Sequence, residues 1–186
     1  LRYYALSSLT PLLGAHGLEV IHAKRIPTHG GSVRVFAARK GAHPVAPSVE
    51  QVRSSEARDP VTLARLRRFR DDVVLSKLEL LALLRDLRRG GKRVYGIGAP
   101  SRASTLVNYV GLDDGILDAV LEVPGSLKLG HYLPGTLIPV DEEARLYRDQ
   151  PDYALLLSWH IADELMPKLR ENGFRGGFIV PLPQPR

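Results

Sequence analysis

A strand that runs through two glycines into a helix start is the part of this sequence best suited to bind a ligand. It reads Val-Tyr-Gly-Ile-Gly-Ala-Pro-Ser-Arg over residues 94–102. Gly96 and Gly98 would let a ligand approach the backbone, Ser101 could cap the helix, and Arg102 would add a positive charge. Ser101 stands where the dinucleotide-binding fingerprint has Gly or Ala, so the match to that motif is partial. The turn predicts a nucleotide-type ligand, with a purely structural strand–helix turn as the alternative.

Two other segments are expected beside this turn. Glu122 ends the next predicted strand, about 20 residues on, where a dinucleotide-binding domain places the acid that binds a ribose. An exposed carboxylate at a strand end is the alternative for Glu122. Ligands of open parallel sheets bind at the carboxyl ends of the strands, so the Gly98 turn, the 123–132 loop and the 158–160 segment should converge.

The isolated histidines are weaker candidates for a functional site. His16, His22 and His43 are predicted to be surface or packing residues, whereas His29, in a Thr-His-Gly-Gly-Ser turn, and His160, at a predicted strand end, are open between packing and function. No Ser-His-Asp order, paired-carboxylate spacing or His-x-x-x-His pair identifies an enzyme from its chemistry alone.

The elements that must position the glycine turn form a regular series. Strands are predicted at 93–97, 119–123, 137–140, 153–157 and 178–180, and helices near 102–110, 141–147 and 161–171. This alternation is typical of an α/β fold with a Rossmann-like, doubly wound parallel sheet, because parallel strands need crossover connections. Pro167 should kink the last helix or end it early.

The amino-terminal part has a different pattern. A helix at 2–13 precedes two β-rich runs at 18–26 and 32–38, joined by the glycine-containing segment 27–31, which favours an antiparallel hairpin. A hairpin alone is marginally stable, so it must pack on another element. Residues 41–60 have the composition of a linker. A long helix is then predicted from Asp59-Pro60, as N-cap and first helical residue, to Gly90-Gly91.

Composition excludes several classes of protein. The 186 residues contain no cysteine, which excludes a disulfide scaffold and thiolate metal sites, and no metal site is expected among them. No apolar run reaches the ~18 residues of a membrane span and the start lacks a signal-peptide profile, so we expect a cytoplasmic protein with no membrane partner. A first residue other than Met suggests a fragment.

The net charge of +6 allows an anionic partner. Many of the arginines fall within the long predicted helix beside acidic residues, as in the Arg-Arg-Phe-Arg-Asp-Asp run at 67–72, and no aromatic stacking platform accompanies them. This pattern predicts a solvated helix face and no nucleic-acid partner.

Seven segments occur in the same order in a known family. They are Tyr-Tyr-Ala-Leu-Ser-Ser-Leu (3–9), Pro-Thr-His-Gly-Gly-Ser-Val-Arg-Val (27–35), Gly-Ile-Gly-Ala-Pro-Ser-Arg (96–102), Thr-Leu-Val-Asn-Tyr (105–109), Tyr-Leu-Pro-Gly-Thr (132–136), Pro-Asp-Tyr-Ala-Leu-Leu-Leu (151–157) and Phe-Ile-Val-Pro (178–181). The chain thereby resembles, over nearly its whole length, the C-terminal region of the S-adenosylmethionine-dependent sugar C-methyltransferases. Those enzymes make branched deoxysugars from nucleoside-diphosphate keto-sugars.

The resemblance implies a three-part enzyme: an N-terminal zinc-binding region, a class I methyltransferase domain that uses S-adenosylmethionine, and a C-terminal Rossmann-like domain for the nucleotide of the substrate. Residues 1–40 would be the last helix and hairpin of the methyltransferase domain, 41–60 a linker, and 61–186 the substrate domain, packed on the missing methyltransferase domain. The family's Tyr-x-Glu-His segment, with the histidine taken as the base, would end just before Leu1. The fragment alone is therefore expected to be inactive, with no catalytic residue of its own.

The implied reaction is removal of the proton beside the keto group of a 4-keto-deoxysugar, followed by attack of C3 on the methyl sulfonium. His29 would lie near the sugar. The implied substrate-binding residues are Gly96, Gly98, Ser101, Arg102, Ser104 and Asn108 near the diphosphate, Lys128 and Tyr132 on the loop above, and Trp159 and His160.

The sequence departs from the family at three places. Arg-Ala-Ser stands at 102–104 where the family commonly has Lys-Gly-Asn, Glu-Val-Pro at 122–124 where it has an Asp-Arg pair, and Ser-Trp-His at 158–160 where it often has Pro-Trp-Asn. The identities of the sugar and of the nucleotide base of the substrate therefore stay open. An NAD(P)-binding Rossmann module of an oxidoreductase and a non-catalytic interaction domain are the alternatives.

Overall fold

The computed structural model describes residues 3–186, apart from the side chain of His29. Leu1, Arg2 and that side chain lie outside the described part. The predicted 2–13 helix starts later than expected, at Leu6, because Ala5 is its extended N-cap residue. The chain divides after Leu66 into two compact units, and each has its own hydrophobic core.

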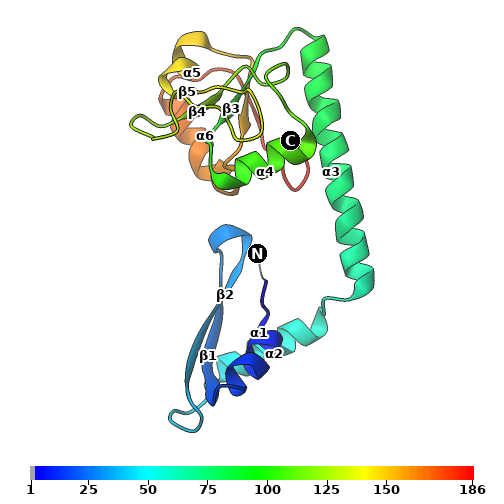
Figure 1. Ribbon diagram of the computed structural model, residues 1–186, viewed down its shortest axis with the longest axis vertical. Helices are drawn as coiled ribbons and strands as arrows, with labels where there is room; N and C mark the ends of the chain where they lie inside the picture. The colour runs from blue at the N-terminus through cyan, green and yellow to red at the C-terminus, as the bar shows by residue number, and fades with distance from the viewer. Residues whose placement is uncertain (1–2) are drawn as a thin grey trace. The chain divides into compact units, whose positions relative to one another are not determined.

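The first unit is a β-hairpin with two helices (Figure 1). Its elements are α1 (Leu6–Gly14), β1 (Leu18–Ile26), the short 3₁₀ helix η1 (Thr28–Gly30), β2 (Ser32–Arg39) and α2 (Pro47–Arg58). The strands pair antiparallel from Ile26 opposite Ser32 to Leu18 opposite Arg39, with one register shift between Val20 and His22. The predicted hairpin is confirmed.

Helix α2 corrects the predicted linker over 41–60. Val49 and Val52 lie one helical turn apart and are buried with Leu6, Val20 and Ala23 in the core of this unit. Composition alone was misleading because these two valines are the only buried side chains of an otherwise polar helix. The element on which the hairpin packs is thus supplied largely by the segment predicted to be irregular.

The long helix α3 (Leu63–Arg89) starts later than predicted. Asp59 is the C-cap of α2 rather than the N-cap of α3, and its carboxylate forms an ion pair with Arg65. The predicted end is confirmed, since Gly91 takes a φ of +68° directly after the helix.

The second unit is a five-stranded parallel sheet with helices on both faces (Figure 1). Its strands are β3 (Val94–Ile97), β4 (Val120–Glu122), β5 (Val140–Glu142), β6 (Tyr153–Leu156) and β7 (Gly177–Ile179), and its helices after α3 are α4 (Ser101–Val110), α5 (Ala144–Asp149), the 3₁₀ helix η2 (Trp159–Ile161) and α6 (Ala162–Glu171). The strand order β5-β4-β3-β6-β7 is that of a doubly wound, Rossmann-like sheet, as predicted.

Alternate strand residues build the two layers of the core. Val94 and Leu155 pack with α3 and α4 on one face, whereas Tyr95 and Leu156 pack with α5 and α6 on the other. Strands that are buried on both faces are apolar at every position, which explains the short continuous apolar runs in the sequence.

Two boundaries in this unit differ from prediction. The strand expected at 137–140 begins only at Val140, because Tyr132 and Pro139 form an isolated antiparallel bridge and the N–H of Leu133 bonds the carbonyl of Ile138. The helix expected at 141–147 is accordingly α5, shifted to 144–149. Helix α6 continues past Pro167 to Glu171, and Leu169 beyond the proline is buried.

Candidate functional site

The strand order reverses between β3 and β6, and the turns that leave these strands are in contact. An ideal Cβ built on Gly98 would lie 2.6 Å from Oγ of Ser158, and Gly98 has a φ of +82°. Gly98 also donates its N–H to the carbonyl of Leu121, at 2.8 Å, which ties the same turn to β4. Parallel open sheets bind ligands at such a reversal point.

Gly96 packs closely against residues of the neighbouring strands. It is buried in β3, and an ideal Cβ there would lie 2.9 Å from Cγ2 of Val120 and 3.0 Å from Cδ1 of Leu157. The absence of a side chain at Gly96 therefore lets neighbouring strands pack closely. The predicted approach of a ligand to Gly96 and Gly98 stays a prediction.

Helix α4 starts immediately after this turn. Pro100 is the N-cap residue, with extended φ and ψ of −67° and 160°, and Ser101 is the first helical residue. The predicted capping by Ser101 is therefore wrong, because the proline already occupies the cap position. Ser101 is exposed, and Arg102 and Ser104 are half-buried in the first turn. The first N–H groups of a helix and its dipole favour an anion at this end.

The loop after β4 reaches the same turn through a carboxylate. Glu122 Oε2 accepts a hydrogen bond from Lys128 Nζ at 2.8 Å and one from Ser126 Oγ at 3.4 Å, while Oε1 accepts the N–H of Ala99 at 3.5 Å. The Glu122 side chain is 13% exposed and that of Lys128 is 50% exposed. The alternative of an exposed carboxylate at Glu122 is therefore wrong, and the predicted convergence of three segments is confirmed.

Asn108 lies further along α4 than Arg102. It lies seven residues after Ser101 on α4, about 10 Å along the helix axis. Its amide nitrogen donates to the carbonyls of Ser104, at 2.7 Å, and Pro134, at 2.8 Å. Both amide hydrogens are thus used within the protein and hold the 132–136 turn against α4. The predicted contact of Asn108 with the diphosphate stays a prediction.

The remaining predicted site residues lie at the edges of this area. Trp159 is half-buried and packs on both core layers of the sheet, and His160 is exposed with its ring edge-on to Trp159 at 6.5 Å between centroids. Tyr132 is 60% exposed. The predicted contact of His29 with the sugar stays a prediction, because its side chain lies outside the described part.

The comparisons agree with the resemblance found in the sequence. The family described as "C-methyltransferase C-terminal domain" matches residues 27–183. The chain belongs to this family. It is also 36% identical over 187 residues to the C-methyltransferase NovU of Streptomyces niveus, an alignment that covers 99% of this chain and 44% of that protein. This C-methyltransferase C-terminal domain homologue thus spans less than half the length of its curated relative.

A cluster of hydrogen-bonded charged and polar side chains, made of Asp149, Arg145 and Tyr95, lies away from the point where the strand order reverses. Hydrogen bonds from Arg145 and Tyr95, which outweigh the effect of burial, lower the pKa of Asp149 to about 2. The hydroxyl of Tyr95 donates to Asp149 Oδ2 at 2.9 Å, and the Arg145 guanidinium lies 5.0 Å above the Tyr95 ring. These contacts fasten α5 to β3 and serve packing.

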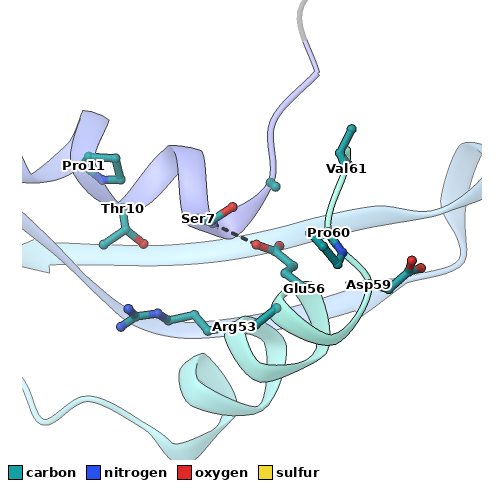
Figure 2. Close-up of a pocket in the computed structure, with 10 residues that line it drawn as sticks. Ser7, Thr10, Pro11, Arg53, Glu56, Asp59, Pro60 and Val61 are labelled. Carbon is teal, nitrogen blue, oxygen red and sulfur yellow. Dashed lines mark hydrogen bonds between the residues drawn. The ribbon is translucent and has the colours of Figure 1, made fainter. Parts of the chain in front are cut away.

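A pocket of about 620 Å³ lies in the first unit, between α1 and the end of α2. Figure 2 shows Glu56 at its centre, pointing toward the start of α1 and hydrogen-bonded to Ser7. The carboxylate oxygens accept the N–H groups of Leu6 and Ser7 at 2.8 and 2.9 Å. Glu56 is a helix-joining residue that sequence reasoning missed, since no local pattern relates positions 6 and 56.

In the part of the chain that the structure describes, no three or more His, Cys, Asp or Glu side chains gather to hold a metal ion. None of the helices described is long and apolar enough to cross a membrane.

Proposed function

We propose that this chain binds the nucleoside-diphosphate end of a keto-sugar in an S-adenosylmethionine-dependent sugar C-methyltransferase. One observation carries the proposal: the start of α4, the Ser158 segment and the Lys128 loop meet at the reversal point of the sheet. Membership of the C-methyltransferase family gives this site its context.

The chemistry of the site suits a diphosphate. Backbone N–H groups at the start of α4 are donors to an anion, and the helix dipole adds a partial positive charge. Arg102 and Lys128 contribute two cations from two different elements. Gly98 lets the turn lie against Ser158, since a side chain at this position would collide with Ser158.

The same residues do not fit S-adenosylmethionine. This cofactor has no phosphate and its net charge is positive, so the anion-binding start of α4 with Arg102 and Lys128 does not match it. We therefore assign the binding of S-adenosylmethionine, and the zinc of the family, to regions outside this chain.

The proposed substrate is a nucleoside-diphosphate 4-keto-deoxysugar that is methylated at C3. The contribution of this chain is orientation: anchoring the diphosphate fixes the position of the sugar ring relative to the base and the methyl donor. Holding two reactants in register is itself a large part of catalysis.

Calorimetric titration of the chain with dTDP, UDP, GDP, NAD and S-adenosylmethionine at fixed salt tests the proposal. We expect a nucleoside diphosphate to bind and S-adenosylmethionine not to bind. Arg102→Ala should lower the affinity for the nucleotide. Gly98→Ala should abolish binding, whereas Gly125→Ala should not. Gly125 is the matched control because its φ of +79° is similar but an ideal Cβ there has nothing within 4 Å.

A dinucleotide-binding module is the second candidate, favoured by the position of Glu122 at the carboxyl end of the strand after the glycine turn. Binding of NAD in the same titration, without any nucleoside diphosphate, would replace the proposal with this alternative.

A further inference from the structure

We infer that Glu122 is a positioning residue for the diphosphate, acting through Lys128 and the turn at Ala99, and that it does not bind the ribose. The inference rests on the proposed function and assigns to the site a residue that the family resemblance did not. Glu122 contacts the two segments that would hold the phosphates, at 2.8 Å to Lys128 Nζ and 3.5 Å to the N–H of Ala99.

The geometry leaves Glu122 poorly placed for a ribose. A ribose-binding acid needs its carboxylate oxygens to accept from two sugar hydroxyls. Here Oε1 accepts from Ala99, and Oε2 accepts from Lys128 and Ser126. A ribose would have to displace a charge-assisted hydrogen bond to a carboxylate that is 13% exposed.

The same geometry suits an indirect role. A lysine side chain has four rotatable carbon bonds, and ordering it on binding costs affinity. The carboxylate of Glu122 orders Lys128 in advance. An ammonium group has three N–H donors, and the bond to Glu122 uses one, so the group can still donate to a phosphate oxygen.

Lys128 can therefore still donate hydrogen bonds to the ligand while it is paired with Glu122. The Glu122 side chain is 13% exposed against 50% for Lys128. The cation is therefore the more accessible of the two charges to an incoming anion.

The test compares ligands with and without a ribose. Inorganic pyrophosphate, dTDP and UDP are titrated calorimetrically, at one ionic strength, into the 186-residue chain and into Glu122→Ala, Glu122→Gln, Lys128→Ala and the Glu122→Ala/Lys128→Ala double variant. Glu142→Ala is the matched control, because Glu142 pairs with Glu122 in the sheet register and ends the neighbouring strand. It removes the same charge close by without removing the bond to Lys128.

We expect Glu122→Ala to lower the affinities for pyrophosphate and for the nucleotide that binds by the same factor, about three- to tenfold, as is typical of coupled neighbours. Glu122→Gln should show a smaller loss, because an amide oxygen can still accept from Lys128. In the Lys128→Ala background the substitution at Glu122 should cause a smaller loss, because only the contact with Ala99 is left to remove. Glu142→Ala should bind as the unmodified chain does. Thermal unfolding of each variant checks that the fold is kept.

Three results would overturn the inference while leaving the proposed function in place. They are a loss confined to the nucleotides, which would make Glu122 a nucleoside ligand; an equal loss with and without Lys128; and an unchanged or tighter affinity in Glu122→Ala. If the unmodified chain binds none of the three ligands, the proposed function itself fails, and the inference fails with it.

Discussion

Glu56 shows how much a single carboxylate contributes to the first unit. Its two oxygens accept the N–H groups of Leu6 and Ser7, which have no partner within α1 because they begin the helix. Burial alone would raise the pKa of Glu56, but these hydrogen bonds outweigh it and hold the pKa below its ordinary value. One side chain of α2 thus satisfies the start of α1.

A Glu56→Gln substitution should lower the free energy of unfolding of this unit by about 1 kcal/mol at pH 7, since a carboxylate at the surface is partly screened. A depressed folded-state pKa stabilises the fold above the ordinary pKa and is lost as the pH falls through the lowered value. The difference between the two proteins should therefore be complete at pH 7 and shrink below about pH 4. Thermal unfolding followed by circular dichroism, with hydrogen exchange of the Leu6 and Ser7 amides, measures it.

The control is Glu50→Gln, which removes the same charge from the same helix but breaks only a contact with Ser54. An equal effect at Glu50, or a difference that persists unchanged at low pH, would contradict this explanation.

At the scale of elements, helix α4 and the 132–136 turn depend on one another. Asn108 donates to the carbonyl of Pro134, and an ideal Cβ on Gly135 would lie 2.2 Å from Asn108 Oδ1. Gly135 also has a φ of +83°. Two of the segments that carry the family resemblance, 105–109 and 132–136, are thus joined by a direct contact.

Gly135→Ala should destabilise the second unit more than Gly130→Ala does. Both glycines have a positive φ, but an ideal Cβ on Gly130 has nothing within 4 Å, so that variant measures the backbone cost alone, about 1–2 kcal/mol. Asn108→Ala removes the atom that collides, so the double variant should cost less than the sum of its parts by about 0.5–3 kcal/mol. Denaturant unfolding followed by Trp159 fluorescence reports this; strict additivity would show that the contact carries no energy.

The sequence predicted elements well where local patterns decide. Strands β3, β4, β6 and β7 and helix α4 lie within two residues of their predicted ends, because short apolar runs and a glycine turn mark them. It failed where distant residues decide. Helix α2 depends on burial of Val49 and Val52 by the hairpin, and the start of β5 depends on a bridge from Tyr132 to Pro139.

The candidate site divides in the same way. Parallel-sheet topology predicted that three loops converge, but not which side chains bind ligand and which bind one another. Motif position predicts substrate contacts for Asn108 and Gly96, but it did not predict that Asn108 holds the 132–136 turn or that Gly96 lets neighbouring strands pack closely. The Glu122 carboxylate was predicted to be either exposed or bound to a ribose, and its bond to Lys128 comes from a loop whose conformation no spacing rule describes.

At the scale of the whole molecule, the two units have separate cores of very different size. The first is built on five buried residues, Leu6, Val20, Ala23, Val49 and Val52, whereas the second has two large clusters on either face of its sheet. The proposed diphosphate site is made entirely of residues from the second unit. Loss of structure in the first unit should therefore leave that site formed.

Val52→Asp tests this expectation, because it places an unpaired charge in the small core and should cost several kcal/mol. Circular dichroism should show loss of α1, α2 and the hairpin at 25 °C. The single tryptophan, Trp159, lies in the second unit, so its fluorescence transition should keep its midpoint, and pyrophosphate should bind as before. Val45→Asp, at a 48% exposed position of the same unit, is the control and should change neither signal. If Val52→Asp also lowers the Trp159 midpoint, the two units fold as one cooperative body, and the diphosphate site depends on the hairpin after all.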